Sequence, residues 1–204
     1  MTAERETQAM SETLLAVPAE TEVAAPERSA WERFLDAMVS YAAERVENES
    51  VSDTILGGLQ VFSHLPGQKS VSLFSLDKDT FEFRHSVSIP DEAGAAAQIL
   101  FPRLVEQDAV AWALDSGYAT ISLNDGSGDA GPQHALLVTL AVPSSVIGLA
   151  LIIFDAPLES FQNILLRLCL LHARQFAFVL NNANLIRTLK GQQSVLEQRV
   201  AART

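Results

Sequence analysis

The stretch HALLVTLAVPSSVIGLALIIF, residues His134–Phe154, decides the fold of this chain. It contains no Asp, Glu, Lys or Arg, and Pro143-Ser144-Ser145 interrupts it in the middle. Each arm is too short for a typical helix and is rich in Val, Ile and Leu, which favours a buried β-strand. A Pro-Ser-Ser break is typical of a turn. The stretch therefore predicts a hairpin of two neighbouring strands at the centre of a sheet.

A membrane span is the alternative for this stretch, because about 20 apolar residues can cross a bilayer. Three features argue against a span: Pro143 in the middle, the absence of Lys and Arg at either flank, and Asp155 directly after the stretch. We therefore expect a soluble module that makes no membrane contact through this segment.

Length and charge narrow the class of protein. The 204 residues suffice for one domain of ordinary size with appended segments. The 14 Lys and Arg residues against 25 Asp and Glu residues give a net charge of -11, which disfavours nucleic acid and anionic membranes as partners. The single cysteine, Cys169, excludes an intrachain disulfide, and the N-terminus lacks the charged-then-apolar order of a signal peptide. We expect a cytoplasmic protein whose partner is a small molecule or another protein.

Ahead of the hairpin, the first 27 residues are rich in Ala, Glu and Thr and contain no aromatic residue, which predicts a disordered leader. From Arg28 onward, apolar residues recur at three- and four-residue steps, which predicts a helix. A second helix is expected to begin with Ser52 or Asp53 as its cap and to end at Pro66-Gly67.

A first hairpin is predicted next, because Ser70–Leu76 and Phe81–Ile89 are rich in β-formers and flank a polar four-residue loop. The second strand alternates, so one face is expected to carry its apolar residues together with one histidine: Phe81, Phe83, His85, Val87 and Ile89. Arg84 is expected on the opposite face. For His85, core packing is the more frequent role of such a histidine.

Three short elements are expected between the hairpins. Leu104–Ser116 has helical apolar spacing and is closed by Gly117. Tyr118–Leu123 is predicted to be a strand, and Asn124–Pro132 is a loop because of its Gly and Asp content.

A long exit helix is predicted after Pro157, with a broad apolar surface packed on the sheet beside the first helix. With Leu165 as an a position, the heptad a and d sites are Leu165, Leu168, His172, Gln175, Val179, Asn182, Ile186, Leu189, Gln193, Leu196 and Val200. This narrow seam predicts a coiled coil over residues 181–204 and a homodimer, with Asn182 as a site that fixes register. The expected dimer contacts are Val179, Asn182, Ile186, Leu189, Leu196 and Val200.

The order of these elements resembles a GAF domain, a small ligand-sensing relative of the PAS fold. EQDAVAWALDSGYATISLND, Glu106–Asp125, is similar to the family's segment in which a helix ends at Gly and a short strand follows. The central hairpin is similar to the family's central strands, with Pro143 and Gly148 near places where the family often has Pro and Gly. The resemblance covers about residues 30–190. It implies an α+β fold, a sensory domain over 28–180, with an antiparallel sheet flanked by N- and C-terminal helices.

The last residues, LEQRVAART from Leu196 to Thr204, resemble the LEQRVAERT segment found just after the sensor domains of bacterial histidine kinases. This resemblance implies that the chain is the N-terminal sensory part of a histidine kinase or a similar signalling protein. The sequence contains no phosphoacceptor histidine motif, glycine-rich ATP-binding box or GGDEF-type motif, so we expect no catalysis by the chain itself.

In GAF domains that bind a ligand, the pocket generally lies on the sheet face away from the terminal helices, under the helix and loop that precede the central strands. By position, the resemblance implies ligand contacts from Phe83, Arg84, His85, Trp112, Tyr118 and His134. For each of these residues, core packing or surface exposure is the more frequent role.

The sequence identifies no cofactor. Bilin attachment and free methionine sulfoxide reduction need a cysteine in the sheet-and-loop region of a GAF domain, whereas Cys169 lies on the exit helix. His85 and His134 are the candidate axial ligands if haem binds. The histidines and the cysteine show no spacing typical of a metal site.

Three functions stay open. A ligand could shift the packing of the terminal helices and so signal through the exit helix. A degenerate GAF domain, its pocket filled by its own side chains, could act as a dimerisation and spacing element. An enzyme could use Asp125 or Asp129 as a general acid or base, although the sequence offers no partner group.

Overall fold

The computed structural model describes residues 25–43, 50–123, 133–155 and 163–201. Residues 1–24 of the predicted leader and the predicted loop Asn124–Pro132, with Asp125 and Asp129, lie outside these ranges. Residues 25–27, also predicted to belong to the leader, are instead the first residues of a helix. The elements are α2 (Ala25–Ala43), α3 (Val51–Phe62), β1 (Gln68–Leu76), β2 (Phe83–Ile89), α4 (Ala93–Glu106), α5 (Ala109–Ser116), β3 (Tyr118–Leu123), β4 (Gln133–Val142), β5 (Ser145–Phe154) and α6 (Asn163–Ala201).

The strands form one five-stranded antiparallel sheet in the order β2-β1-β5-β4-β3. The predicted central hairpin is confirmed: β4 and β5 pair through Leu136 with Ile152 and Val138 with Ala150. Gly148 on β5 is required by a close approach, because a Cβ there would collide with the backbone oxygen of Phe74 on β1. The α+β class is confirmed.

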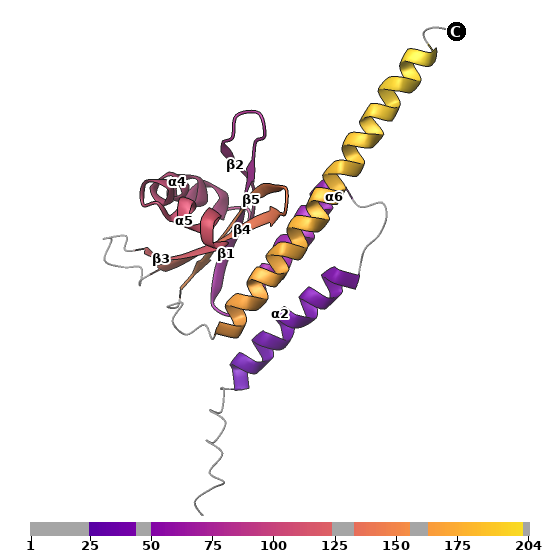
Figure 1. Ribbon diagram of the computed structural model, residues 1–204. Coiled ribbons are helices and arrows are strands. Elements are labelled where there is room, and N and C mark those ends of the chain that lie inside the picture. The colour runs from indigo at the N-terminus through magenta and orange to yellow at the C-terminus, as the bar shows by residue number, and fades with distance from the viewer. Residues whose placement is uncertain (1–24, 44–49, 124–132, 156–162, 202–204) are drawn as a thin grey trace, which may run out of the picture.

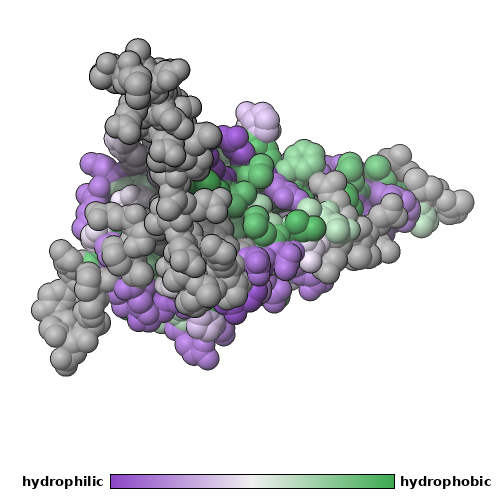
Figure 2. Space-filling model, turned by 90° about the horizontal axis from the view of Figure 1, so that it is seen from below, coloured by the Kyte–Doolittle hydropathy of each residue, from purple (hydrophilic) through white to green (hydrophobic). Residues whose placement is uncertain are grey.

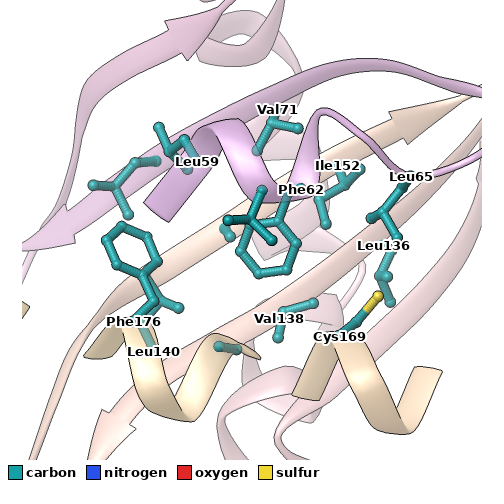
Figure 3. Close-up of a cluster of buried hydrophobic side chains, with 14 of the residues drawn as sticks. Leu59, Phe62, Leu65, Val71, Leu136, Val138, Leu140, Ile152, Cys169 and Phe176 are labelled. Carbon is teal, nitrogen blue, oxygen red and sulfur yellow. The ribbon is translucent and has the colours of Figure 1, made fainter. Parts of the chain in front are cut away.

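Helices cover both faces of the sheet (Figure 1). On one face, α3 and α6 pack on the strands, and α2 packs on α3. Figure 3 shows Leu59 and Phe62 of α3 and Phe176 of α6 meeting Val138 and Ile152 of the sheet. The terminal helices thus share one core, as the sequence predicts.

The opposite face carries α4 and α5. Its core joins Phe101 and Leu104 of α4 to Phe74, Leu137 and Leu149 of the strands. The two hydrophobic clusters are separated by the sheet, because adjacent residues of one strand project to opposite faces.

Helix α6 has two halves. The first half buries Leu165, Phe176 and Leu180 in the core. Beyond residue 183 every side chain described up to Arg199 is exposed, and the helix extends past the sheet as an arm (Figure 1). The broad apolar surface predicted to pack on the sheet includes Ile164 and Leu171, but these two residues are 61% and 57% exposed.

By length and composition alone, Ile164–Arg199 of α6 could cross a membrane, with a mean hydropathy of 1.3 and 39% of its apolar window buried in the protein. A core helix of a soluble protein passes the same test.

Strand β2 differs from its predicted alternation. Leu73 and Phe74 are adjacent on β1, yet their partners on β2 are Val87 and His85, so Ser86 is an extra residue in a β-bulge. The bulge turns Phe83 and His85 toward α4, whereas Val87 and Ile89 pack on the α6 side. Phe81 precedes the strand with a φ of 57° and is 78% exposed. The prediction of one shared apolar face was therefore wrong.

Two helix boundaries also differ from prediction. The cap of α3 is Ser50, not Ser52 or Asp53: the backbone N–H of Asp53 donates to Ser50 Oγ at 3.1 Å, while the Asp53 carboxylate accepts from the Ser50 N–H. The predicted helix Leu104–Ser116 is split between α4 and α5, because Asp108 adopts a left-handed conformation with a φ of 58°. Gly117 closes α5 as predicted, with a φ of 88°.

Candidate ligand cavity under helix α4

A cavity of about 890 Å³ lies between α4 and the end of the sheet. Its wall combines one side of α4 with residues from four strands. The lining residues are Lys69, Ser70, Pro90, Glu92, Ala93, Ala96, Ala97, Ile99, Leu100, Arg103, Leu123, Gln133 and Ile153.

The sequence of α4 explains why a cavity remains between this helix and the sheet. Three lining residues of this helix are alanines, Ala93, Ala96 and Ala97, whose short side chains do not fill the distance from the helix to the sheet. Below them, Ile153 of β5 forms part of the cavity, and Leu123 and Gln133 flank it from the ends of β3 and β4.

The mainly apolar wall of the cavity also contains charged and polar residues. Lys69 and Arg103 are the basic lining residues, and Glu92 is the acidic one. Lys69 Nζ forms an ion pair with Asp155 Oδ1 at 3.2 Å, and both side chains are more than half exposed, so screening by water keeps this pair weak. A mainly apolar wall with a few polar groups is typical of sites for small molecules.

Beyond the cavity, aromatic side chains fill the centre of the same sheet face. The rings of Phe74 and Phe101 stack with their centroids 4.0 Å apart, and Phe83 meets Phe101 edge-on at 5.9 Å. Phe74 also contacts the His85 ring at 5.5 Å. Bulky side chains of this chain therefore occupy the middle of the face, and the cavity lies toward the end of the sheet.

His85 belongs to a chain of polar contacts at the edge of this aromatic group. His85 Nε2 and Ser88 Oγ are 2.8 Å apart, and Ser88 Oγ lies 2.7 Å from Ser72 Oγ, with both serines buried. Gln98 Nε2 of α4 donates to His85 Nδ1 at 3.3 Å. Gly94 allows this packing, because a Cβ there would lie 3.1 Å from His85 Cε1. The network ties β1 and β2 to α4.

The six residues implied by the family resemblance are spread over both faces of the sheet. Phe83 and His85 come together on the α4 side, around Phe74 and Phe101. Tyr118 packs on the α6 side of the sheet, and His134 Nδ1 lies 3.3 Å from Ser122 Oγ.

The remaining two lie at the surface. Arg84 forms ion pairs with Asp77 at 3.4 Å and with Glu82 at 3.8 Å, and Trp112 of α5 is 65% exposed. The wall of the cavity under α4 is made by other residues, so ligand contact by these six stays a prediction.

The lining residues of the cavity could not be predicted from the sequence, because few of them are of a type that indicates ligand binding. Alanines on a short helix and residues at strand ends have no pattern that distinguishes a cavity from ordinary packing. The one available sign was Ala93–Ala97, a run of small residues between the first hairpin and the predicted helix Leu104–Ser116.

Two reactive side chains of α6 are buried on the other face. Burial raises the pKa of the Cys169 thiol to about 12, which suppresses thiolate chemistry. Burial also lowers the pKa of His172 to about 4, against a smaller opposing effect of its hydrogen bond to Gly58. Among the described residues, His, Cys, Asp and Glu side chains form no group of three that could hold a metal ion.

No protein-family model matches the chain, and no curated protein matches it. Solved structures similar to it include two GAF domain structures. The GAF domain/HD domain protein from Geobacter sulfurreducens is 16% identical with a TM-score of 0.46, and the match covers 67% of this chain and 96% of that one. The GAF domain from Acinetobacter phosphoenolpyruvate-protein phosphotransferase is 11% identical with a TM-score of 0.42, and the match covers 80% and 98% of the two chains.

Proposed function

We propose that this chain is a cytoplasmic, GAF-like sensory module. A small molecule binds in the cavity under α4, and α6 carries the signal to an output domain such as a histidine kinase. The proposal gives the chain itself no catalytic role. The observation that carries it is the position of β5 between the cavity and the core that holds α6.

Neighbouring residues of strand β5 contact the cavity on one face of the sheet and the core that holds α6 on the other. Ile153 lines the cavity, while Ile152 and Phe154 belong to the core cluster that contains Leu165 and Phe176 of α6. An occupant that displaces Ile153 acts on the same strand against which α6 packs. Such coupling requires different ligand affinities for two packings of α6, typically worth about 1–3 kcal/mol.

The cavity wall suggests the class of ligand. Its apolar part, from Ala93 to Leu100 and Ile153, suits an apolar body, and Lys69 with Arg103 suits an anionic group. The ligand we propose is therefore a small, partly apolar anion.

Output through α6 is supported by the exposed arm. Leu189 and Leu196 are 63% and 60% exposed on a helix that leaves the domain, and apolar residues in this spacing favour pairing with another helix. We propose a homodimer through α6. The resemblance of Leu196–Thr204 to the segment that follows kinase sensor domains supports a histidine kinase as the output.

A second candidate is a degenerate GAF domain that serves only as a dimerisation and spacing element. The stacked rings of Phe74 and Phe101 favour it, because they fill the centre of the α4 face.

Native mass spectrometry of the full chain as purified separates the two candidates. The sensory proposal expects a dimer that carries extra mass. Ala96→Trp, which fills the cavity from α4, should lose that mass, whereas Ala95→Trp, at an exposed position outside the lining of the cavity, should keep it. A dimer without bound mass would support the spacing element, and a monomer would contradict both.

A further inference from the structure

The burial of α6 contradicts an unbroken heptad seam along this helix. In the seam predicted from sequence, Leu165 and His172 are a positions. Both are buried in the domain's own core, at 2% and 0% exposure. A partner helix therefore cannot contact them while the domain is folded.

A different row of apolar residues faces away from the core. Ile164, Leu171 and Phe178 are each at least half exposed and recur at intervals of seven residues. Leu168 and Gln175 fall between them at alternating steps of four and three and are half-buried, and Leu168 also packs against the edge of the core. This is the spacing of a coiled-coil seam, shifted by one residue from the positions that the core occupies.

The exposed row continues into the arm along the same direction. Eighteen residues make about five turns of an α-helix at 3.6 residues per turn, so residues 18 apart project the same way. Leu189 lies 18 residues after Leu171, and Leu196 lies 18 after Phe178. Both are exposed. The surface in Figure 2 shows hydrophobic side chains continuing toward the arm.

We infer that α6 pairs in parallel with α6 of a second copy along one continuous seam, which begins beside the domain and changes heptad register at Asn182. The inference rests on the proposed dimer and deepens it. The seam contains Ile164, Leu168, Leu171, Gln175, Phe178, Asn182, Ile186, Leu189, Gln193 and Leu196.

The change of register has a physical reason. From Phe178 to Asn182 to Ile186 the seam takes two successive steps of four residues, which makes an 11-residue repeat locally. A strict seven-residue repeat winds around a straight helix, whereas an inserted step of four unwinds the coil. The inserted step keeps the seam opposite the core where α6 leaves the sheet.

The partner must be a helix of similar length. From Ile164 to Leu196 the seam spans about 48 Å at 1.5 Å per residue. The other helices described in this chain are shorter, since the longest of them, α2, has 19 residues, so a second α6 fits. Parallel pairing sets Asn182 opposite Asn182, where the two amides can donate and accept in turn.

Disulfide cross-linking of the full chain tests the register. Phe178→Cys and Leu171→Cys are expected to shift the band on a non-reducing gel from monomer to dimer. Val179→Cys, the neighbouring residue and an a position of the unbroken heptad, is expected to remain monomeric on the gel. Leu189→Cys belongs to both seams and reports pairing of the arm. The native Cys169 is buried, so the unmodified chain serves as the background.

The outcomes separate this inference from the proposed dimer. Cross-linking at Leu189→Cys together with Val179→Cys but not Phe178→Cys would overturn the register change and leave the dimer standing. Cross-linking at Leu189→Cys alone would also overturn the inference, because the seam would then be confined to the arm. If no variant cross-links and the chain is monomeric in solution, both fail.

Discussion

The imidazole of His172 on α6 bonds to the backbone oxygen of Gly58 on α3, with 2.9 Å between Nε2 and the oxygen. Since a carbonyl oxygen only accepts, Nε2 must carry the proton. The other ring nitrogen, Nδ1, is buried without a hydrogen-bond partner, and the ring is surrounded by Phe62, Phe176 and Tyr41. This contact fixes α6 on the core at the point where the exposed seam runs along its other side.

The burial of His172 predicts loss of stability in mild acid. Its pKa is about 4 in the folded protein and 6.5 without burial, so the unfolded chain binds the proton first as the pH falls. The free energy of unfolding should therefore decrease between about pH 6.5 and pH 4, by up to about 3 kcal/mol from this group. Urea unfolding at several pH values measures it.

His172→Phe supplies the comparison, because phenylalanine fits the aromatic surroundings and does not titrate. Its stability should fall less steeply over this pH range than that of the unmodified chain. Equal slopes for the unmodified chain and His172→Phe would show that His172 is not buried as a neutral ring.

The contact between α3 and α6 also depends on Gly58. A Cβ at this position would collide with the ring of Phe176. Gly58→Ala should therefore destabilise the protein by about 1–3 kcal/mol through overpacking, despite the better helix propensity of alanine. Gly191→Ala on the arm, where no atom lies within 4 Å of the new Cβ, should stabilise the helix by up to about 1 kcal/mol. A lower unfolding temperature for Gly58→Ala and a higher one for Gly191→Ala would confirm the contact between Gly58 and Phe176. Higher unfolding temperatures for both variants would refute it.

The aromatic stack on the other face is expected to be a major part of the core. Phe101→Ala removes the ring that stacks on Phe74 at 4.0 Å and should cost about 3–5 kcal/mol. Phe81→Ala, at a ring that is 78% exposed, should change stability by less than about 0.5 kcal/mol. Similar costs for the two variants in urea unfolding would mean that the stack adds little.

The arm of α6 is expected to control assembly. Leu189→Glu with Leu196→Glu places four carboxylates in the seam of a dimer and should give a monomer with an unchanged sheet domain. Val105→Glu with Trp112→Glu replaces two exposed apolar residues of α4 and α5 and should leave the dimer intact. Analytical ultracentrifugation measures both variants. A dimeric arm variant would place the interface elsewhere.

The fold could be predicted where the hydrophobic pattern was long and unambiguous. His134–Phe154 gave two strands because its length, its lack of charge and its central turn left one consistent solution. The bulge in β2, beyond which the apolar side chains project to the other face of the sheet, could not be predicted. It depends on how Ser86 lies between the residues that pair with Leu73 and Phe74 of β1. Two a positions of the predicted heptad, Leu165 and His172, lie in the core for a related reason. Leu165 is equally suited to a seam and to a core, and only the position of the sheet decides between them.

The candidate site was less predictable than the fold. The family resemblance implied aromatic and titratable residues such as Trp112 and His85 by their position in the chain. The cavity instead arises from what Ala93, Ala96 and Ala97 lack, namely side chains long enough to reach the sheet.

The central claim is that the occupant of the cavity influences α6 through β5. Amide hydrogen exchange of the full chain tests it most directly, with Ala96→Trp as a permanent occupant and Ala95→Trp as the matched control. The account predicts that Ala96→Trp changes exchange in β5 and in α6 up to Leu196, while Ala95→Trp leaves α6 as it is in the unmodified chain. Identical exchange along α6 in all three proteins, with β5 altered beside the filled cavity, would contradict the coupling.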